Sequence, residues 1–229
     1  MRLAVFALGL LACGGTTAAS DGGVDASADA KKEASPLDAT PDVLDATDGS
    51  SGCVPDLPDA YAPTWISPSA PSAACTTTQI QELYDDCHGP NQSPSACNAF
   101  VAVPANATCQ SCMETPIGST TYGAMIAWHD GASLEANIGG CMALLDGDLG
   151  ASGCGTKYEA WDGCVIAACS YCPGGTYESC AVPARSGPCG ASESAAQTCA
   201  NDPTYATCVS QPTFEDFFKT FGAMFCAAD

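Results

Sequence analysis

The sequence predicts a mainly α-helical body, a disulfide-rich bundle of short helices with long loops, preceded by a disordered tether. Three observations support this fold class. Apolar side chains recur at helical spacing in several short segments. Cysteines fall repeatedly on the apolar faces of these segments, which indicates that disulfides join one helix to another. Strand signals are sparse and limited to residues 64–66 and 100–103.

The first predicted helix covers residues 76–87. Its apolar face has i, i+3, i+4, i+7 spacing and consists of Ile80, Leu83, Tyr84 and Cys87. The threonines before Gln79 can cap the free N–H groups at its start. Further along, Ser93 places a capping residue ahead of Pro94, which favours a second short helix that stops before Pro104.

Three more helices are predicted in the second half of the body. Thr156 and Glu159 fit a capping box at the start of the first one. Its apolar stripe consists of Tyr158, Trp161, Val165, Ala168 and Cys172. Asp202 before Pro203 begins a short helix, and Thr213 can cap the last one. The phenylalanines on one face of this last helix are Phe214, Phe217, Phe218, Phe221 and Phe225.

Two weaker helical patterns cover residues 122–129 and 138–145. Asn106 belongs to an Asn-Ala-Thr triplet that has the letters of a glycosylation site. We expect Asn106 instead to cap a helix around Cys109.

The chain has 17 cysteines, and an odd number needs an explanation in an oxidising compartment. Setting aside Cys13, near the N-terminus, leaves sixteen in the body, and their pairing stays open. The sixteen are Cys53, Cys75, Cys87, Cys97, Cys109, Cys112, Cys141, Cys154, Cys164, Cys169, Cys172, Cys180, Cys189, Cys199, Cys208 and Cys226. Two Cys-x-x-Cys pairs, Cys109/Cys112 and Cys169/Cys172, are interpreted as structural. Neither lies in the βαβ setting of a redox pair, and an even number of cysteines in an oxidising compartment argues against zinc.

The cysteine spacings also suggest an internal repeat. The series from Cys75 to Cys112 resembles the series from Cys141 to Cys172, offset by about 66 residues. The residues between the cysteines do not match well, so duplication and coincidence both stay open.

Charge limits the partners of this protein. The 26 acidic residues outnumber the 6 basic ones, which gives a formal net charge of -20. Surfaces that bind nucleic acid carry a basic footprint, so nucleic acid is excluded as a partner. The same charge repels anionic lipid head groups.

Residues 1–12 have the pattern of a secretory signal, in which Arg2 precedes an apolar run too short to span a bilayer. The run ends in the tetrapeptide LLAC (residues 10–13), which resembles the lipobox of bacterial lipoproteins. The resemblance implies that Cys13 becomes the mature N-terminus and carries diacylglycerol and an acyl chain such as palmitate. Two or more chains hold a protein stably on a membrane. Gly14, in place of aspartate, favours the outer membrane by analogy, on its periplasmic or outer face.

The segment 13–52 is small, polar and acidic, and it has no aromatic residue. Such a composition buries too little apolar surface to fold, so we expect a disordered tether with a span of about 35 Å. The tether would hold the body, residues 53–229, away from a membrane. Two alternatives are an ordinary cleaved signal with Cys13 merely nearby, and an acidic tail that binds basic partners.

Candidate catalytic groups are few. The chain has two histidines, His88 and His129, both near expected helix ends, and it has no GxSxG nucleophile motif. Asp146 and Asp148 form only a fragment of a calcium loop. We therefore assign no catalytic residue and expect neither a metal nor a cofactor.

The sequence thus predicts a membrane-anchored cell-envelope lipoprotein. Its disulfide-stabilised body would have a binding or structural role toward an unidentified envelope protein or ligand. A non-enzymatic role is preferred because no catalytic constellation is present in the sequence. Two alternatives stay open: an envelope hydrolase with an unrecognised site, and a thiol–disulfide carrier that uses a Cys-x-x-Cys pair.

Overall fold

The computed structural model describes residues 53–128, 133–172 and 176–227. These ranges hold nearly all of the cysteine-rich body. The predicted signal peptide, the lipid attachment at Cys13, the tether and His129 lie outside the described residues.

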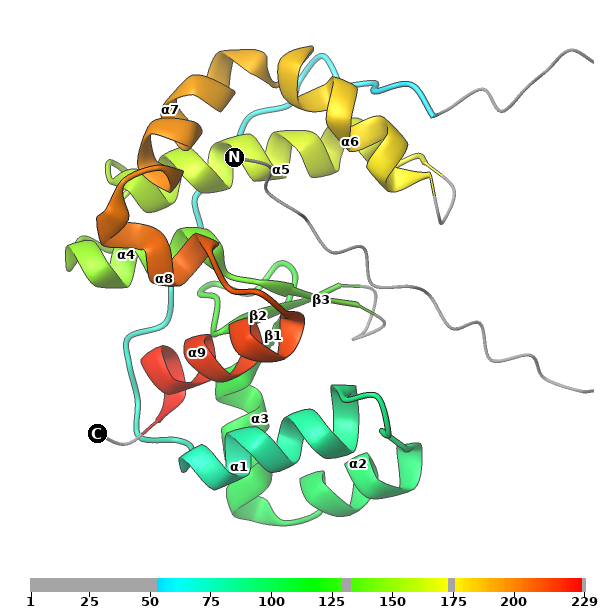
Figure 1. The fold of residues 1–229 in the computed structure, drawn as a ribbon, viewed down its shortest axis with the longest axis vertical. Coiled ribbons are helices and arrows are strands. Elements are labelled where there is room, and N and C mark those ends of the chain that lie inside the picture. Colours follow the sequence, from blue (N-terminus) through cyan, green and yellow to red (C-terminus); the bar gives the residue numbers. More distant parts are fainter. Residues whose placement is uncertain (1–52, 129–132, 173–175, 228–229) are drawn as a thin grey trace, which may run out of the picture.

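The described chain is mainly α-helical, as predicted, and it also contains one small sheet (Figure 1). The helical elements are α1 (Thr77–Leu83), the π-helical turn η1 (Tyr84–His88), α2 (Pro94–Val101), α3 (Pro104–Met113), α4 (Ile138–Asp146), α5 (Cys154–Cys169), α6 (Tyr177–Ser186), α7 (Gly190–Ala200), the 3-10 turn η3 (Pro203–Tyr205), α8 (Ala206–Val209) and α9 (Phe214–Cys226). The strands are β1 (Glu114–Pro116), β2 (Met125–Trp128) and β3 (Ser133–Ala136). The central strand β2 runs parallel to β1 and antiparallel to β3.

Two groups of helices lie on opposite sides of this sheet (Figure 1). On one side, α9 packs against α1 and α3, and the main core there includes Phe218, Phe221 and Leu83. On the other side, α5 packs against α6 and α7. A smaller core there includes Val165 of α5 and Ala181 of α6.

Side-chain caps start several of the predicted helices. At α1 the hydroxyl of Thr76 accepts from the backbone N–H of Gln79, and the side chain of Gln79 accepts from the backbone N–H of Thr76. At α2 the hydroxyl of Ser93 accepts from the backbone N–H of Ala96, and at α9 the hydroxyl of Thr213 accepts from that of Asp216. The predicted helices at residues 138–145 and after Asp202 are also confirmed, by α4 and by η3 with α8.

The weak helical pattern over residues 122–129 is wrong, because this stretch contains strand β2. Met125, Ile126 and Ala127 are all buried, so the segment is apolar on both faces. A short run that is apolar throughout has no periodicity that separates a buried strand from a helix. The pairing of β2 on both edges decides the outcome.

Three local predictions also fail. Thr156 does not cap α5, because the helix begins earlier, after Gly153. The hydroxyl of Thr156 instead donates to the carbonyl of Gly150. Asn106 lies inside α3 rather than at its start, and its side chain accepts a hydrogen bond from Gln79. The strand signal at residues 100–103 falls at the end of α2, where Phe100 belongs to the core.

The segment that precedes α1 joins the two helical groups (cyan in Figure 1). At its start, Asp56 donates a backbone hydrogen bond to Ala168 of α5. In its middle, the indole N–H of Trp65 donates to the carbonyl of Leu149. At its end, Cys75 donates to the carbonyl of Cys226 in α9. Hydrogen bonds therefore hold this segment against both helical groups.

All sixteen cysteines of the body are paired. The disulfides are Cys53–Cys172, Cys75–Cys109, Cys87–Cys97, Cys112–Cys226, Cys141–Cys208, Cys154–Cys199, Cys164–Cys189 and Cys169–Cys180. In the last four of these disulfides, each pair of cysteines lies in sequence between the two cysteines of the pair before it. These four bonds join α4 and α5 to α6, α7 and α8 and to the turn before α7.

The pairing bears on two sequence features. Neither Cys-x-x-Cys motif is closed on itself, because each of its cysteines bonds to a partner elsewhere. The two similar cysteine series also pair differently. The series beginning at Cys75 contains two internal disulfides, whereas every cysteine in the series beginning at Cys141 bonds outside that series. The similar spacing therefore does not correspond to a repeated disulfide unit.

Candidate functional site

A cavity of about 380 Å³ lies between α5, the sheet and the segment that precedes α1. Its walls come from parts of the chain far apart in the sequence, including Tyr61, Trp128 of β2 and Glu159 of α5. A cavity of this size is within the range of small-molecule binding sites in proteins.

Aromatic and aliphatic side chains make up most of the wall. The aromatic residues are Tyr61, Tyr122, Trp128 and Tyr158. The isoleucines are Ile66, Ile117, Ile126, Ile138 and Ile166. Such walls favour a ligand with an apolar body, and any polar groups among them then fix its orientation.

Helix α5 presents different side chains on its two sides. Glu159, Asp162 and Ile166 follow i, i+3, i+7 spacing and line the cavity. Val165 and Ala168 lie on the other side, in the core shared with α6. Val165 and Ala168 of the predicted apolar stripe lie on this second side, whereas its first residue, Tyr158, lines the cavity and Cys172 lies beyond the end of α5. The polar side carried no recognisable motif, so the sequence did not indicate the cavity.

Three carboxylates converge on the cavity. Glu159 and Asp162 come from α5, and Glu135 comes from β3. The indole N–H of Trp128 donates to Glu135 at 2.9 Å. Glu135 and Asp162 also share a side-chain hydrogen bond. This interaction with Asp162 favours the protonated form of Glu135.

The surroundings favour the neutral forms of two of these groups. Burial raises the pKa of Glu135 well above its usual value, and the negative charge of Asp162 raises it further. Burial and the charge of Asp162 raise the pKa of Glu159 to about 7. Burial raises the pKa of Tyr61, and the charges of Glu159 and Asp162 raise it further. Each carboxylate therefore disfavours a second negative charge in the cavity.

The charge of Arg185 acts near the cavity but outside its wall. Its guanidinium lies 5.7 Å from the ring centroid of Trp161. It lowers the pKa of Tyr158, although burial and the carboxylates raise that pKa by more. None of the described residues that line the cavity is a lysine, arginine or histidine.

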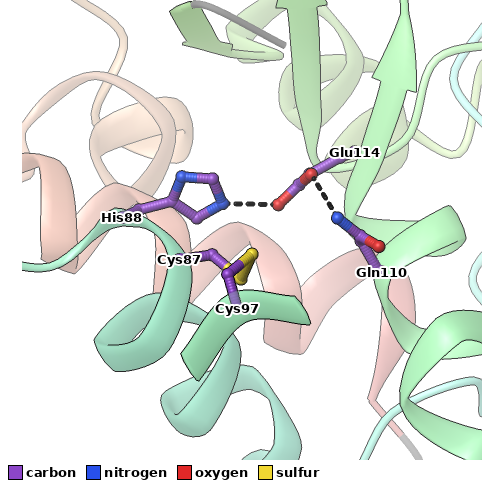
Figure 2. Close-up of polar contacts among 5 residues, drawn as sticks. All are labelled: Cys87, His88, Cys97, Gln110 and Glu114. Carbon is purple, nitrogen blue, oxygen red and sulfur yellow. Dashed lines mark hydrogen bonds and ion pairs between the residues drawn. A yellow bond between two sulfur atoms is a disulfide. The ribbon is translucent and has the colours of Figure 1, made fainter. Parts of the chain in front are cut away.

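His88, the candidate histidine within the described residues, does not reach the cavity. Its Nε2 atom lies 2.6 Å from a carboxylate oxygen of Glu114, and the other oxygen of Glu114 accepts from Gln110 at 3.1 Å (Figure 2). Its ring also lies 5.3 Å from that of Phe218. The neighbouring Cys87 is in a disulfide and offers no thiolate. His88 thus ties η1 to the junction of α3 and β1.

The two carboxylates of the calcium-loop fragment already have hydrogen-bond partners within the protein. Asp146 accepts a hydrogen bond from the hydroxyl of Tyr205 at 2.5 Å, which raises the pKa of this tyrosine to about 12. Asp148 accepts from the backbone of Gly150 and from the hydroxyl of Ser152. Asp146 therefore links the end of α4 to η3, and Asp148 stabilises the turn that follows α4.

Ligand-atom geometry gives little support for a metal centre. Within residues 53–128, 133–172 and 176–227, one group of at least three potential ligand atoms lies within 4.8 Å of one another. It consists of Cys53, Cys172 and Cys180. All three are in disulfides and so cannot coordinate as thiolates.

No family model, curated protein or solved structure matches this chain. Across the part of the chain that the structure describes, no helix combines the length and the apolar character needed to cross a membrane.

Proposed function

We propose that this protein is a cell-envelope lipoprotein whose disulfide-stabilised domain binds a small molecule. The LLAC tetrapeptide at residues 10–13 supports lipidation at Cys13, and the acidic segment up to residue 52 suits a tether. In this proposal the lipid holds the protein on the outer membrane, and the domain captures its ligand near the surface.

The observation that carries the binding role is the cavity itself. Apolar rings and isoleucines form its wall, and three carboxylates from two separate elements face it. All three carboxylates are half-buried, and partial removal of a carboxylate from water costs free energy unless the group is paired or hydrogen bonded. Buried titratable groups with raised pKa values in a concave apolar site are typical of functional sites.

An uncharged fluorescent dye tests the binding role. N-phenyl-1-naphthylamine should bind the purified protein, and Ala167→Trp should abolish its binding, because Ala167 lines the cavity. Ala195→Trp on the exposed face of α7 is the matched control and should bind the dye as wild type does. Ala62→Trp, at the exposed rim, repeats the test without altering a helix. Equal binding by all four proteins would place the dye elsewhere and refute the proposal.

One observation favours a hydrolase as the second candidate. Asp162 and burial raise the pKa of Glu135 well above its usual value, and a carboxyl group with a raised pKa suits a general acid. Turnover of nitrophenyl esters or glycosides that is lost in Glu135→Gln but kept in Glu82→Gln would support it. Glu82 is an exposed carboxylate on α1 and so serves as the control.

A thiol–disulfide carrier has less support. The cysteines of both Cys-x-x-Cys motifs are bonded to partners on other elements, so neither motif forms the internal disulfide of a redox pair. Thiol titration of the native protein tests this alternative, since a carrier requires a reactive or readily reduced cysteine.

A further inference from the structure

The charged side chains that line the cavity are all acidic, and this restricts the charge of a ligand that can bind there. Glu135, Glu159 and Asp162 all face the same space, and no described cationic side chain lines it. An anionic ligand would add to the repulsion among these groups, whereas a cationic ligand would relieve it. Charge complementarity therefore favours a positively charged occupant.

The walls show what kind of cation fits. Aromatic faces attract ammonium groups, and this attraction is strongest where water is excluded. Tyr61, Tyr122, Trp128 and Tyr158 surround the same space as the carboxylates. A divalent metal instead needs several oxygen ligands in a close shell. Within the described residues the three carboxylates do not form a group of ligand atoms within 4.8 Å of one another.

We propose that the cavity binds an organic ammonium compound with an apolar body, and that its binding displaces a proton from the carboxylates. This inference rests on the binding role proposed above and specifies the chemistry of the ligand. The ammonium group lies against the α5 carboxylates and the rings, and the apolar body packs on the isoleucines.

The proton exchange follows from the surroundings of Glu159. Besides burial, the charge that raises the pKa of Glu159 is that of Asp162, and Asp162 and Glu159 both act on Glu135. The carboxylates also raise the pKa values of Tyr61, Tyr158 and Tyr177, whereas Arg185 lowers those of Tyr158 and Tyr177. The pKa of Glu159 is raised to about 7, so the group is largely protonated below that pH. A bound cation favours the ionised form, so binding releases a proton and strengthens as the pH rises through 7.

Three small probes with the same branched body but different charges test the inference. Choline is cationic, 3,3-dimethylbutan-1-ol is its neutral carbon analogue, and 3,3-dimethylbutanoate is an anion. Because choline keeps its charge at every pH, any pH dependence of its affinity reports on the protein. Binding is measured by ligand-detected NMR and by displacement of the neutral dye.

Choline should bind at least about tenfold more tightly than the neutral analogue, and the anion should not bind. Its affinity should rise between about pH 5.5 and pH 8. Glu159→Gln should weaken choline binding and flatten this pH dependence, whereas Glu82→Gln should leave both unchanged. Asp162→Asn is a second variant that should also weaken choline binding. If both variants fold poorly, the pH dependence of choline affinity in the wild-type protein still tests the proton exchange.

The outcomes separate this inference from the binding role. If the neutral analogue binds as tightly as choline, and Ala167→Trp blocks both, the cavity binds ligands but the ammonium inference is wrong. Choline affinity that does not change with pH would refute the proton exchange. If neither the dye nor any of the three probes binds, the binding role and the ammonium inference both fail.

Discussion

Asn137 is the buried polar residue at the junction of the sheet and α4, with 3% of its surface exposed. Its side-chain oxygen accepts from the backbone of Gly140 at 2.8 Å and so caps α4. Its amide nitrogen donates to the carbonyl of Gly123 at 2.8 Å. One side chain therefore fixes the start of α4 and the entry to β2, two elements that border the cavity.

We predict that Asn137→Ala lowers the free energy of unfolding by about 2–3 kcal/mol, through loss of the cap and of a buried partner. Denaturant unfolding with the disulfides intact measures this. Asn98→Ala is the control, because Asn98 is exposed on α2 and should change stability by less than about 0.5 kcal/mol. A loss no larger than that of the control would contradict the role of Asn137.

Glu159 should make stability depend on pH. Its pKa rises from 4.5 when unfolded to about 7 when folded, so the fold favours its protonated form. This contribution is complete below pH 4.5 and is lost as the pH rises toward 7. Glu159→Gln should therefore be more stable than wild type by about 1–2 kcal/mol at pH 8, and by much less at pH 4.5. Unfolding curves of both proteins at several pH values check this, and parallel pH profiles would contradict it.

At the scale of elements, the crossing of α4 and α5 depends on two glycines. A Cβ atom on Gly155 would lie 2.2 Å from the carbonyl oxygen of Gly139. Helix propensity alone favours alanine by about 1 kcal/mol, so the close approach decides the outcome. The two helices must separate to admit a methyl group, and α5 carries the cavity carboxylates.

We predict that Gly155→Ala destabilises the fold by about 1–3 kcal/mol, despite the better helix propensity of alanine. Gly190→Ala in α7 is the matched control. Its new Cβ would meet only ordinary contacts, so it should be neutral or stabilising. Thermal unfolding of the two variants distinguishes these effects, and similar melting temperatures would argue against a tight α4–α5 crossing.

The elements also show where sequence reasoning succeeds. Caps at Thr76, Ser93 and Thr213 act within one turn, so the starts of α1, α2 and α9 could be predicted from neighbouring residues. Strand β2 could not, because its buried run gains its hydrogen bonds from β1 and β3. Asn137 has the residue type of a cap, yet its second bond, to Gly123, depends on tertiary packing.

At the scale of the whole molecule, composition predicts a helical body rich in disulfides, but not which cysteines meet. The bond between Cys53 and Cys172 spans 119 residues, and the bond between Cys112 and Cys226 spans 114. Such pairings depend on the path of the entire chain. The cavity is non-local in the same way, since Glu135 and Asp162 meet only when β3 packs near α5. The sequence therefore predicts the class of fold but not the site.

Native mass spectrometry of the full-length protein, extracted from its own membrane in mild detergent, tests the account most directly. We predict a mass increase from diacylglycerol and an acyl chain on the fragment that begins at Cys13, and one bound small molecule. That molecule should be absent from Ala167→Trp and retained by Ala195→Trp. An unmodified Cys13 would contradict the anchor. A protein without a bound molecule, or one that keeps it when the cavity is filled, would contradict the binding role.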